Sequence, residues 1–150
     1  MGVPFFTTVR EYAARKNVRL LLWYNSSGDW NETDFTPKST LLAPAQRRAE
    51  FARLQQMGIA GIKVDFFAGD GQSMIGYYRD ILRDAAEHEL LVNFHGCTLP
   101  RGLQRTFPNL MTMESARGLE FVTFTQDNAD QAPEHMAMLP FTRNVFDPMD

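Results

Sequence analysis

Three carboxylates stand out because each lies at or after the end of an apolar stretch with the composition of a buried strand. Asp65 is near the end of Gly58–Phe67, Glu114 ends Asn109–Glu114, and Glu120 follows shortly afterwards. Ligands of α/β proteins bind at the carboxyl ends of parallel strands, so we expect the three side chains on one face. Two acids that flank a bond are what glycoside hydrolysis requires. Carboxylate oxygens also suit a hard cation such as calcium.

Three further side chains lie at the ends of predicted strands. Lys63 precedes Asp65 by two positions and points to the same side of the strand. Two charges there indicate a wet cavity or a buried ion pair, with Asp65 as a cap of the next helix as a further alternative. His95 could bind a sugar hydroxyl, and Trp23 could form a pocket wall. For both, the alternative is a structural role in the core.

Apolar runs and helical spacing alternate along the chain. The predicted strands are Val18–Tyr24, Gly58–Phe67, Leu90–His95, Asn109–Glu114 and Phe141–Phe146. The predicted helices are Phe5–Asn17, Pro44–Met57, Met74–Glu89 and Glu134–Met138, with a long loop over Glu120–Pro133. Strands that alternate with helices predict an α/β fold with a parallel sheet. A complete (β/α)8 TIM barrel needs about 250 residues, so we expect part of one, roughly five of its eight βα units.

The composition excludes several classes of protein. The chain has 150 residues, 44% hydrophobic and 22% charged, with a formal net charge of −3. The lack of a basic patch argues against a nucleic-acid partner. No apolar run approaches the roughly 18 residues of a membrane span, and the N-terminus does not resemble a signal peptide. The single cysteine, Cys97, excludes an internal disulfide, and we expect it to be an ordinary packing residue. The abrupt end without a polar tail suggests a fragment of one catalytic domain.

Four motifs resemble glycoside hydrolase family 97. They are KVDF at Lys63–Phe66, NFHG at Asn93–Gly96, PRGLQRTFPNLMTMESARGLE at Pro100–Glu120, and LPFTRNVFDPMD from Leu139 to the end. They occur in the family's order and cover nearly the whole chain. The resemblance implies an exo-acting α-glycosidase with a calcium-dependent (β/α)8 domain, periplasmic or secreted in bacteria. Residues 1–150 would be a fragment of that domain, without the family's flanking β-sandwich and C-terminal β-domain.

Two positions distinguish the mechanistic branches of this family. Asp65 matches the nucleophile of the retaining branch, which is similar to α-galactosidases. The inverting branch, similar to α-glucosidases, lacks this aspartate and carries a glutamate after the histidine that matches His95. Here that position is Gly96. The resemblance therefore implies a retaining enzyme that hydrolyses terminal α-linked sugars by double displacement.

The resemblance also assigns roles to the other polar residues. Asp65 would be the nucleophile and Glu120 the general acid/base. Glu114 would bind Ca²⁺ and share the ion with Glu120. Lys63 and His95 would hold sugar hydroxyls of an oligosaccharide or α-glycoside. The remaining barrel units and flanking domains of the same full-length chain would be the structural partners.

Three alternatives remain on the sequence alone. One is an inverting, α-glucosidase-like member of the family. Another is a non-catalytic carbohydrate-binding module, which would keep Trp23, Lys63 and His95 without needing Glu120. The third is an inactive partial barrel with exposed strand edges.

Overall fold

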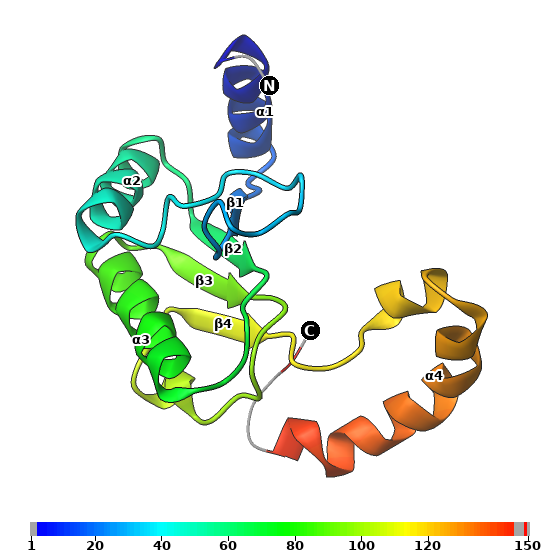
Figure 1. Ribbon diagram of the computed structural model, residues 1–150. Coiled ribbons are helices and arrows are strands. Elements are labelled where there is room, and N and C mark those ends of the chain that lie inside the picture. The colour runs from blue at the N-terminus through cyan, green and yellow to red at the C-terminus, as the bar shows by residue number, and fades with distance from the viewer. Residues whose placement is uncertain (1–2, 146–148, 150) are drawn as a thin grey trace.

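A parallel sheet forms the centre of the computed structural model, which describes residues 3–145 and 149. Its strand order is β1-β2-β3-β4 (Figure 1). The strands are β1 (Leu21–Asn25), β2 (Gly61–Asp65), β3 (Leu91–Phe94) and β4 (Leu110–Met113). The α-helices are α1 (Val3–Arg15), α2 (Pro44–Gln56), α3 (Gln72–Glu87) and α4 (Gln126–Met138). Short 3₁₀ helices are η1 (Leu103–Arg105), η2 (Leu119–Thr123), η3 (Leu139–Phe141) and η4 (Arg143–Val145).

The hydrophobic core lies between one face of the sheet and the helices α2 and α3. Side chains alternate between the faces of a strand, and in β2 Ile62 and Val64 are the buried pair. Phe51 of α2 and Ile81 of α3 pack in the same core cluster. Each such side chain stabilises the fold by about 1.5–3 kcal/mol when fully buried. This burial sets the register that turns Lys63 and Asp65 to the opposite face.

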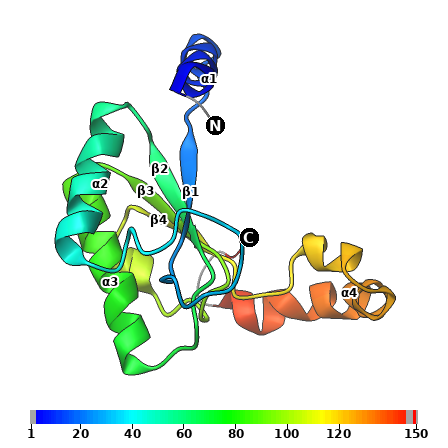
Figure 2. The same ribbon diagram turned by 45° about the horizontal axis from the view of Figure 1, so that its top comes forward.

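Local sequence explains where the covering helices begin and end. Pro44 is the first residue of α2, where a proline ring already has the helical φ and the missing N–H costs nothing. Gly58, with a φ of 70°, follows the end of that helix. Apolar residues of α3 recur at helical spacing, and its Tyr78, Ile81 and Leu82 are fully buried. The two helices therefore lie on the same side of the sheet (Figure 2).

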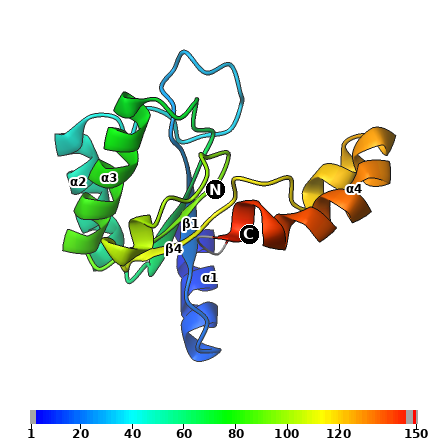
Figure 3. The same cartoon turned by 90° about the horizontal axis from the view of Figure 1, so that it is seen from below.

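The segment after β4 takes a different direction. The helix α4 stands off from the sheet, on the side opposite α2 and α3 (Figure 3). It packs on η2, the turn that carries Glu120. No helix among residues 3–145 is long and apolar enough to cross a membrane.

Most predicted elements are confirmed, with boundaries that move by a few residues. The first three helices and the first four strands are present, and all three strand pairings are parallel. This arrangement is consistent with part of a TIM barrel.

Two predictions after β4 are wrong. The predicted loop Glu120–Pro133 contains η2 and most of α4, and the predicted helix Glu134–Met138 is only the end of α4. The predicted strand Phe141–Phe146 is not formed, because residues 141–145 belong to 3₁₀ turns; Phe146 lies outside the described residues. The described residues therefore form four strands where five were predicted for the chain.

Candidate active site

A cleft of about 410 Å³ opens at the carboxyl ends of the strands. Its lining consists of acidic, imidazole and aromatic side chains and a single glycine: Trp23, Phe35, Asp65, Phe66, His95, Gly96, Glu114, Glu120, Phe121 and Phe124. All three predicted carboxylates thus lie together with the predicted histidine and tryptophan, as expected for residues at the carboxyl ends of parallel strands. A cleft with aromatic walls and a few converging polar groups is the usual form of a small-molecule site.

Asp65 has a fixed orientation in this cleft. The indole Nε1–H of Trp23 donates to its Oδ2 over 3.3 Å, and the backbone N–H of Phe66 donates to its Oδ1 over 2.7 Å. Phe66 has a φ of 64°, in the left-handed region that is uncommon for a bulky residue. Strained backbone of this kind concentrates at functional sites. The carboxylate is therefore held from the neighbouring strand and from its own backbone.

Glu114 and Glu120 differ in their surroundings. Glu114 is buried, accepts the backbone N–H of Gly96 at Oε2 over 2.6 Å, and has His95 Nδ1 3.7 Å from its Oε1. Glu120 belongs to η2 and is exposed to solvent. The Glu114 carboxylate is thus held by a backbone N–H, whereas Glu120 is open to solvent.

Lys63 lies deeper in the sheet than the cleft. It occupies the register between Trp23 of β1 and Asn93 of β3, on the same face as Asp65. Within residues 3–145 and 149 it is not part of the cleft lining and forms no ion pair with Asp65. Its contact with a sugar hydroxyl stays a prediction.

The aromatic wall was only partly predicted. The Trp23 ring lies 6.0 Å from that of Phe35 and 5.9 Å from that of Phe66, and these two phenyl rings are stacked at 5.8 Å. Phe121 and Phe124 contact each other at 5.2 Å elsewhere in the lining. Flat aromatic faces suit the C–H face of a pyranose ring. Of these aromatic residues only Trp23 was predicted, from its position at the end of a predicted strand.

Asn25 holds the loop that presents Phe35. It is the last residue of β1 and is fully buried, and its Nδ2 donates to the Phe35 carbonyl over 3.2 Å. Its Oδ1 accepts the N–H of Ser27 over 2.9 Å. Asn25 was not among the predicted site residues, although it directly follows the predicted strand Val18–Tyr24.

Two tyrosines of α3 support the loops on either side of Asp65. The Tyr77 hydroxyl donates to the Ser26 carbonyl over 3.0 Å, and the Tyr78 hydroxyl accepts the Thr98 N–H over 3.1 Å. Burial raises the pKa of both hydroxyls far above the ordinary tyrosine value, so neither ionises at physiological pH. These contacts couple the core helix to the rim of the cleft.

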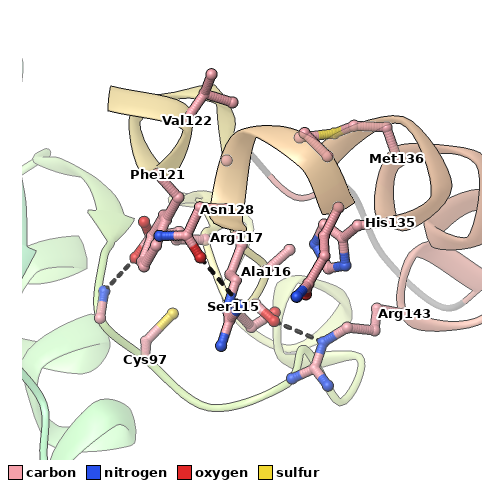
Figure 4. A pocket seen from close by; sticks show the side chains of 15 residues that line it. Cys97, Ser115, Ala116, Arg117, Phe121, Val122, Asn128, His135, Met136 and Arg143 are labelled. Carbon is pink, nitrogen blue, oxygen red and sulfur yellow. Dashed lines mark hydrogen bonds between the residues drawn. The ribbon is translucent and has the colours of Figure 1, made fainter. Parts of the chain in front are cut away.

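A second cavity adjoins the cleft and shares Gly96, Glu114 and Phe121 with it (Figure 4). Arg143 Nε donates to the Ser115 carbonyl over 2.6 Å, and Arg117 Nη1 donates to Asn128 Oδ1 over 3.3 Å. These bonds attach α4 and the turn after it to the end of β4. They help to place η2, and with it Glu120, beside the strand ends.

The donor set for a cation is incomplete. Glu114 and Glu120 line one cleft and offer hard oxygen ligands, as calcium prefers. Among the described residues, however, no group of three acidic, histidine or cysteine side chains forms a metal site. Calcium takes about 6–8 oxygen ligands. The two glutamates alone therefore do not complete a calcium shell.

The sequence matches a known family and two curated relatives. The family described as Glycoside hydrolase 97 matches residues 6–116. A probable retaining alpha-galactosidase of Streptomyces bingchenggensis is 40% identical over 105 residues, which are 70% of this chain and 15% of that protein. A retaining alpha-galactosidase of Bacteroides thetaiotaomicron is 31% identical over 140 residues, which are 93% of this chain and 19% of that protein.

Solved structures of glycoside hydrolases are also similar to this chain. A beta-arabinopyranosidase superposes with a TM-score of 0.93 at 41% identity, over 100% of this chain and 24% of that one. A glycoside hydrolase family 97 enzyme from a Pseudoalteromonas strain, solved with panose and with acarbose, gives a TM-score of 0.75 at 26% identity. It matches 96% of this chain and 23% of its own. The chain thus spans between 15% and 24% of the length of these relatives.

Proposed function

This chain belongs to glycoside hydrolase family 97, and from that premise we propose that it supplies part of the active site of a retaining exo-acting α-glycosidase. The observation that carries the proposal is the oriented carboxylate of Asp65 in a cleft that it shares with Glu120. An acid on a rigid strand suits direct attack, and an acid at the solvent side suits proton exchange with a leaving group and with water.

The proposed reaction is a double displacement. A carboxylate oxygen of Asp65 bonds to the anomeric carbon while Glu120 gives its proton to the departing glycosidic oxygen. This step releases the alcohol and leaves a glycosyl ester on Asp65. Glu120 then takes a proton from water, the water oxygen bonds to the anomeric carbon, and the ester bond breaks to free Asp65. The sugar leaves with the configuration it had in the substrate.

We infer the sugar from the relatives. Two of them are named retaining alpha-galactosidases, which favours a terminal α-galactoside as substrate. A second candidate is a β-arabinopyranoside, favoured by the beta-arabinopyranosidase that superposes over the whole chain. In the L series that sugar has the ring hydroxyl arrangement of an α-galactoside but lacks the exocyclic hydroxymethyl group. Both substrates therefore fit one arrangement of catalytic acids.

The test is an Asp65→Gly variant of the full-length protein, assayed on an aryl α-galactoside and an aryl β-L-arabinopyranoside. We expect loss of turnover by at least about a thousandfold, because the nucleophile is removed. Azide should restore release of the aryl group and form the β-galactosyl azide, since it fills the space of the carboxylate. Proton NMR of the native enzyme should show the α-galactose anomer first. Full activity of the variant, or initial β-galactose, would reject the assignment.

We further propose that Glu114 and Glu120 hold calcium together with ligands from elsewhere in the full-length protein or from water. Such an ion would supply positive charge near the departing oxygen. Exhaustive chelation of the full-length protein should lower kcat and melting temperature, and added Ca²⁺ should restore both. Metal-free protein that keeps its activity and its melting temperature would contradict the proposal.

A further inference from the structure

We infer that Gly96 is a positioning residue for the site, because it fixes Glu114 through its backbone and leaves space for Asp65 through its missing side chain. The inference rests on the proposed function, since it concerns the acids of that reaction. Gly96 follows β3 and lines the cleft between the two carboxylates. Its φ of 52° lies in the left-handed region that glycine adopts without strain.

The first contact is made to Glu114. The Gly96 N–H donates to Oε2 over 2.6 Å, a charge-assisted hydrogen bond. The backbone N–H of Glu114 in turn donates to the Phe94 carbonyl over 2.9 Å, so the two segments are joined at both ends. A backbone donor cannot rotate away as a side chain does. The buried carboxylate is therefore tied to the conformation of residue 96.

The second contact concerns Asp65. A Cβ at position 96 would lie 3.0 Å from Asp65 Oδ1, 3.1 Å from Phe66 N and 3.4 Å from Phe66 Cα. The same Phe66 N–H donates to the same Oδ1 over 2.7 Å. A side chain at position 96 would thus press on both ends of the hydrogen bond that orients the carboxylate.

No small side-chain movement relieves this crowding. The carboxylate can turn away only by weakening the bonds from Phe66 and Trp23, and the other two crowded atoms belong to the backbone. Attack at an anomeric carbon depends on a closely defined position of the nucleophile, and a misplacement of about 1 Å can cost about a hundredfold in rate. A shift of a few tenths of an ångström at Asp65 is expected to cost about tenfold.

The experiment compares Gly96→Ala with Gly69→Ala in the full-length protein. Gly69 also has a left-handed backbone, with a φ of 75°, but nothing lies within 4 Å of the Cβ it would gain. Both variants carry the strain of alanine in that conformation, and only the first adds the contact with Asp65. We expect kcat of Gly96→Ala to fall about tenfold with KM changed less than about threefold, and Gly69→Ala to stay within about twofold.

A crystal structure of Gly96→Ala provides a readout that does not depend on turnover. We expect Asp65 Oδ1 or the Phe66 backbone to be displaced from its native position. Unmoved Asp65 and Phe66, or a kcat equal to that of Gly69→Ala, would overturn the inference. Failure of the proposed function gives other results: the native protein would hydrolyse neither aryl glycoside, or Asp65→Gly would be fully active. In either case, the position of Asp65 and Phe66 in the Gly96→Ala crystal structure still tests the role of Gly96.

A second variant covers the case in which Gly96→Ala does not fold. Removing the carboxylate in Gly96→Ala/Asp65→Ala relieves the closest contact, so the double variant should be recovered as folded protein. If Gly96→Ala does fold, the decrease in melting temperature that it causes should be smaller in the Asp65→Ala background than in the native protein. Equal losses in both backgrounds, or equal insolubility, would overturn the inference.

Discussion

Trp23 is the residue through which β1 contacts Asp65, the proposed nucleophile at the end of β2. Its indole N–H donates to Asp65 Oδ2, and its ring packs against Phe35 and Phe66. The first contact orients the carboxylate, and the second builds the wall of the cleft. Phenylalanine at this position would keep an aromatic ring and lose only the donor, which separates the two roles.

We therefore expect Trp23→Phe to lower kcat by about tenfold, equivalent to about 1.4 kcal/mol of transition-state stabilisation, with a smaller change in KM. Steady-state kinetics of the full-length protein on the aryl glycosides would measure both. Trp30→Phe is the matched control, because Trp30 is 73% exposed. A Trp23→Phe enzyme with native kcat would show that the 3.3 Å hydrogen bond does not contribute to catalysis.

Cleft residues could be predicted from the sequence where they lie at the end of a predicted strand. Asp65, Glu114, His95 and Trp23 line one cleft because the strands are parallel, so that their carboxyl ends meet at one edge of the sheet. Phe35 escaped prediction, since it lies in an irregular loop that is folded back by hydrogen bonds to Asn25. The left-handed backbone of Phe66 also carries no signal in residue type.

The helices α2 and α3 are joined by a buried ion pair. Arg47 is 2% exposed; its Nη2 lies 2.5 Å from Asp84 Oδ2, and its Nε donates to the same oxygen over 2.7 Å. Its Nη1 also donates to the Leu41 carbonyl over 2.9 Å, which fixes the segment that enters α2. A buried carboxylate without this partner would pay its full cost of desolvation.

Arg47→Met should therefore destabilise the protein by about 3–5 kcal/mol, because it removes the buried partner of Asp84 and leaves only the longer contact to the half-exposed Arg48. Arg48→Met is the control: the Arg48 side chain is 50% exposed and lies 3.6 Å from Asp84, so its loss should cost less than about 1 kcal/mol. Urea unfolding of both variants followed by tryptophan fluorescence would give the difference. Equal losses of unfolding free energy in the two variants would mean that the buried Arg47–Asp84 pair stabilises the protein no more than the exposed contact of Arg48.

The elements after β4 show why periodicity alone fails there. The helix α4 has no buried side chain and hence no apolar stripe to predict it. It is supported by polar contacts instead: the Thr125 hydroxyl caps the N–H of Asn128, and Gln126 bonds to Asp130 across one turn. Of the apolar residues in the predicted fifth strand, the described Phe141 and Val145 are exposed.

In the part of the chain that the structure describes, the sheet has two open edges and one polar face. There, β1 and β4 each pair with a neighbouring strand on one side only. The face away from α2 and α3 carries polar groups that bond across strands, such as Asn93 Nδ2 to Thr112 Oγ1 over 2.7 Å. A closed barrel has no edges and needs such an inner face. The sheet is therefore organised as part of a barrel would be.

A polypeptide of these 150 residues made alone should consequently self-associate, because open strand edges are templates for pairing. We expect its mass, measured by light scattering, to rise with concentration from about 1 to 100 μM. Met111→Lys should reduce this association, since Met111 lies on β4, is exposed, and would place a charge on the edge. Ala86→Lys, which adds the same charge on exposed α3 surface, should not. A polypeptide that stays monomeric throughout, or an equal effect of both lysines, would show that the strand edges are not what drives association.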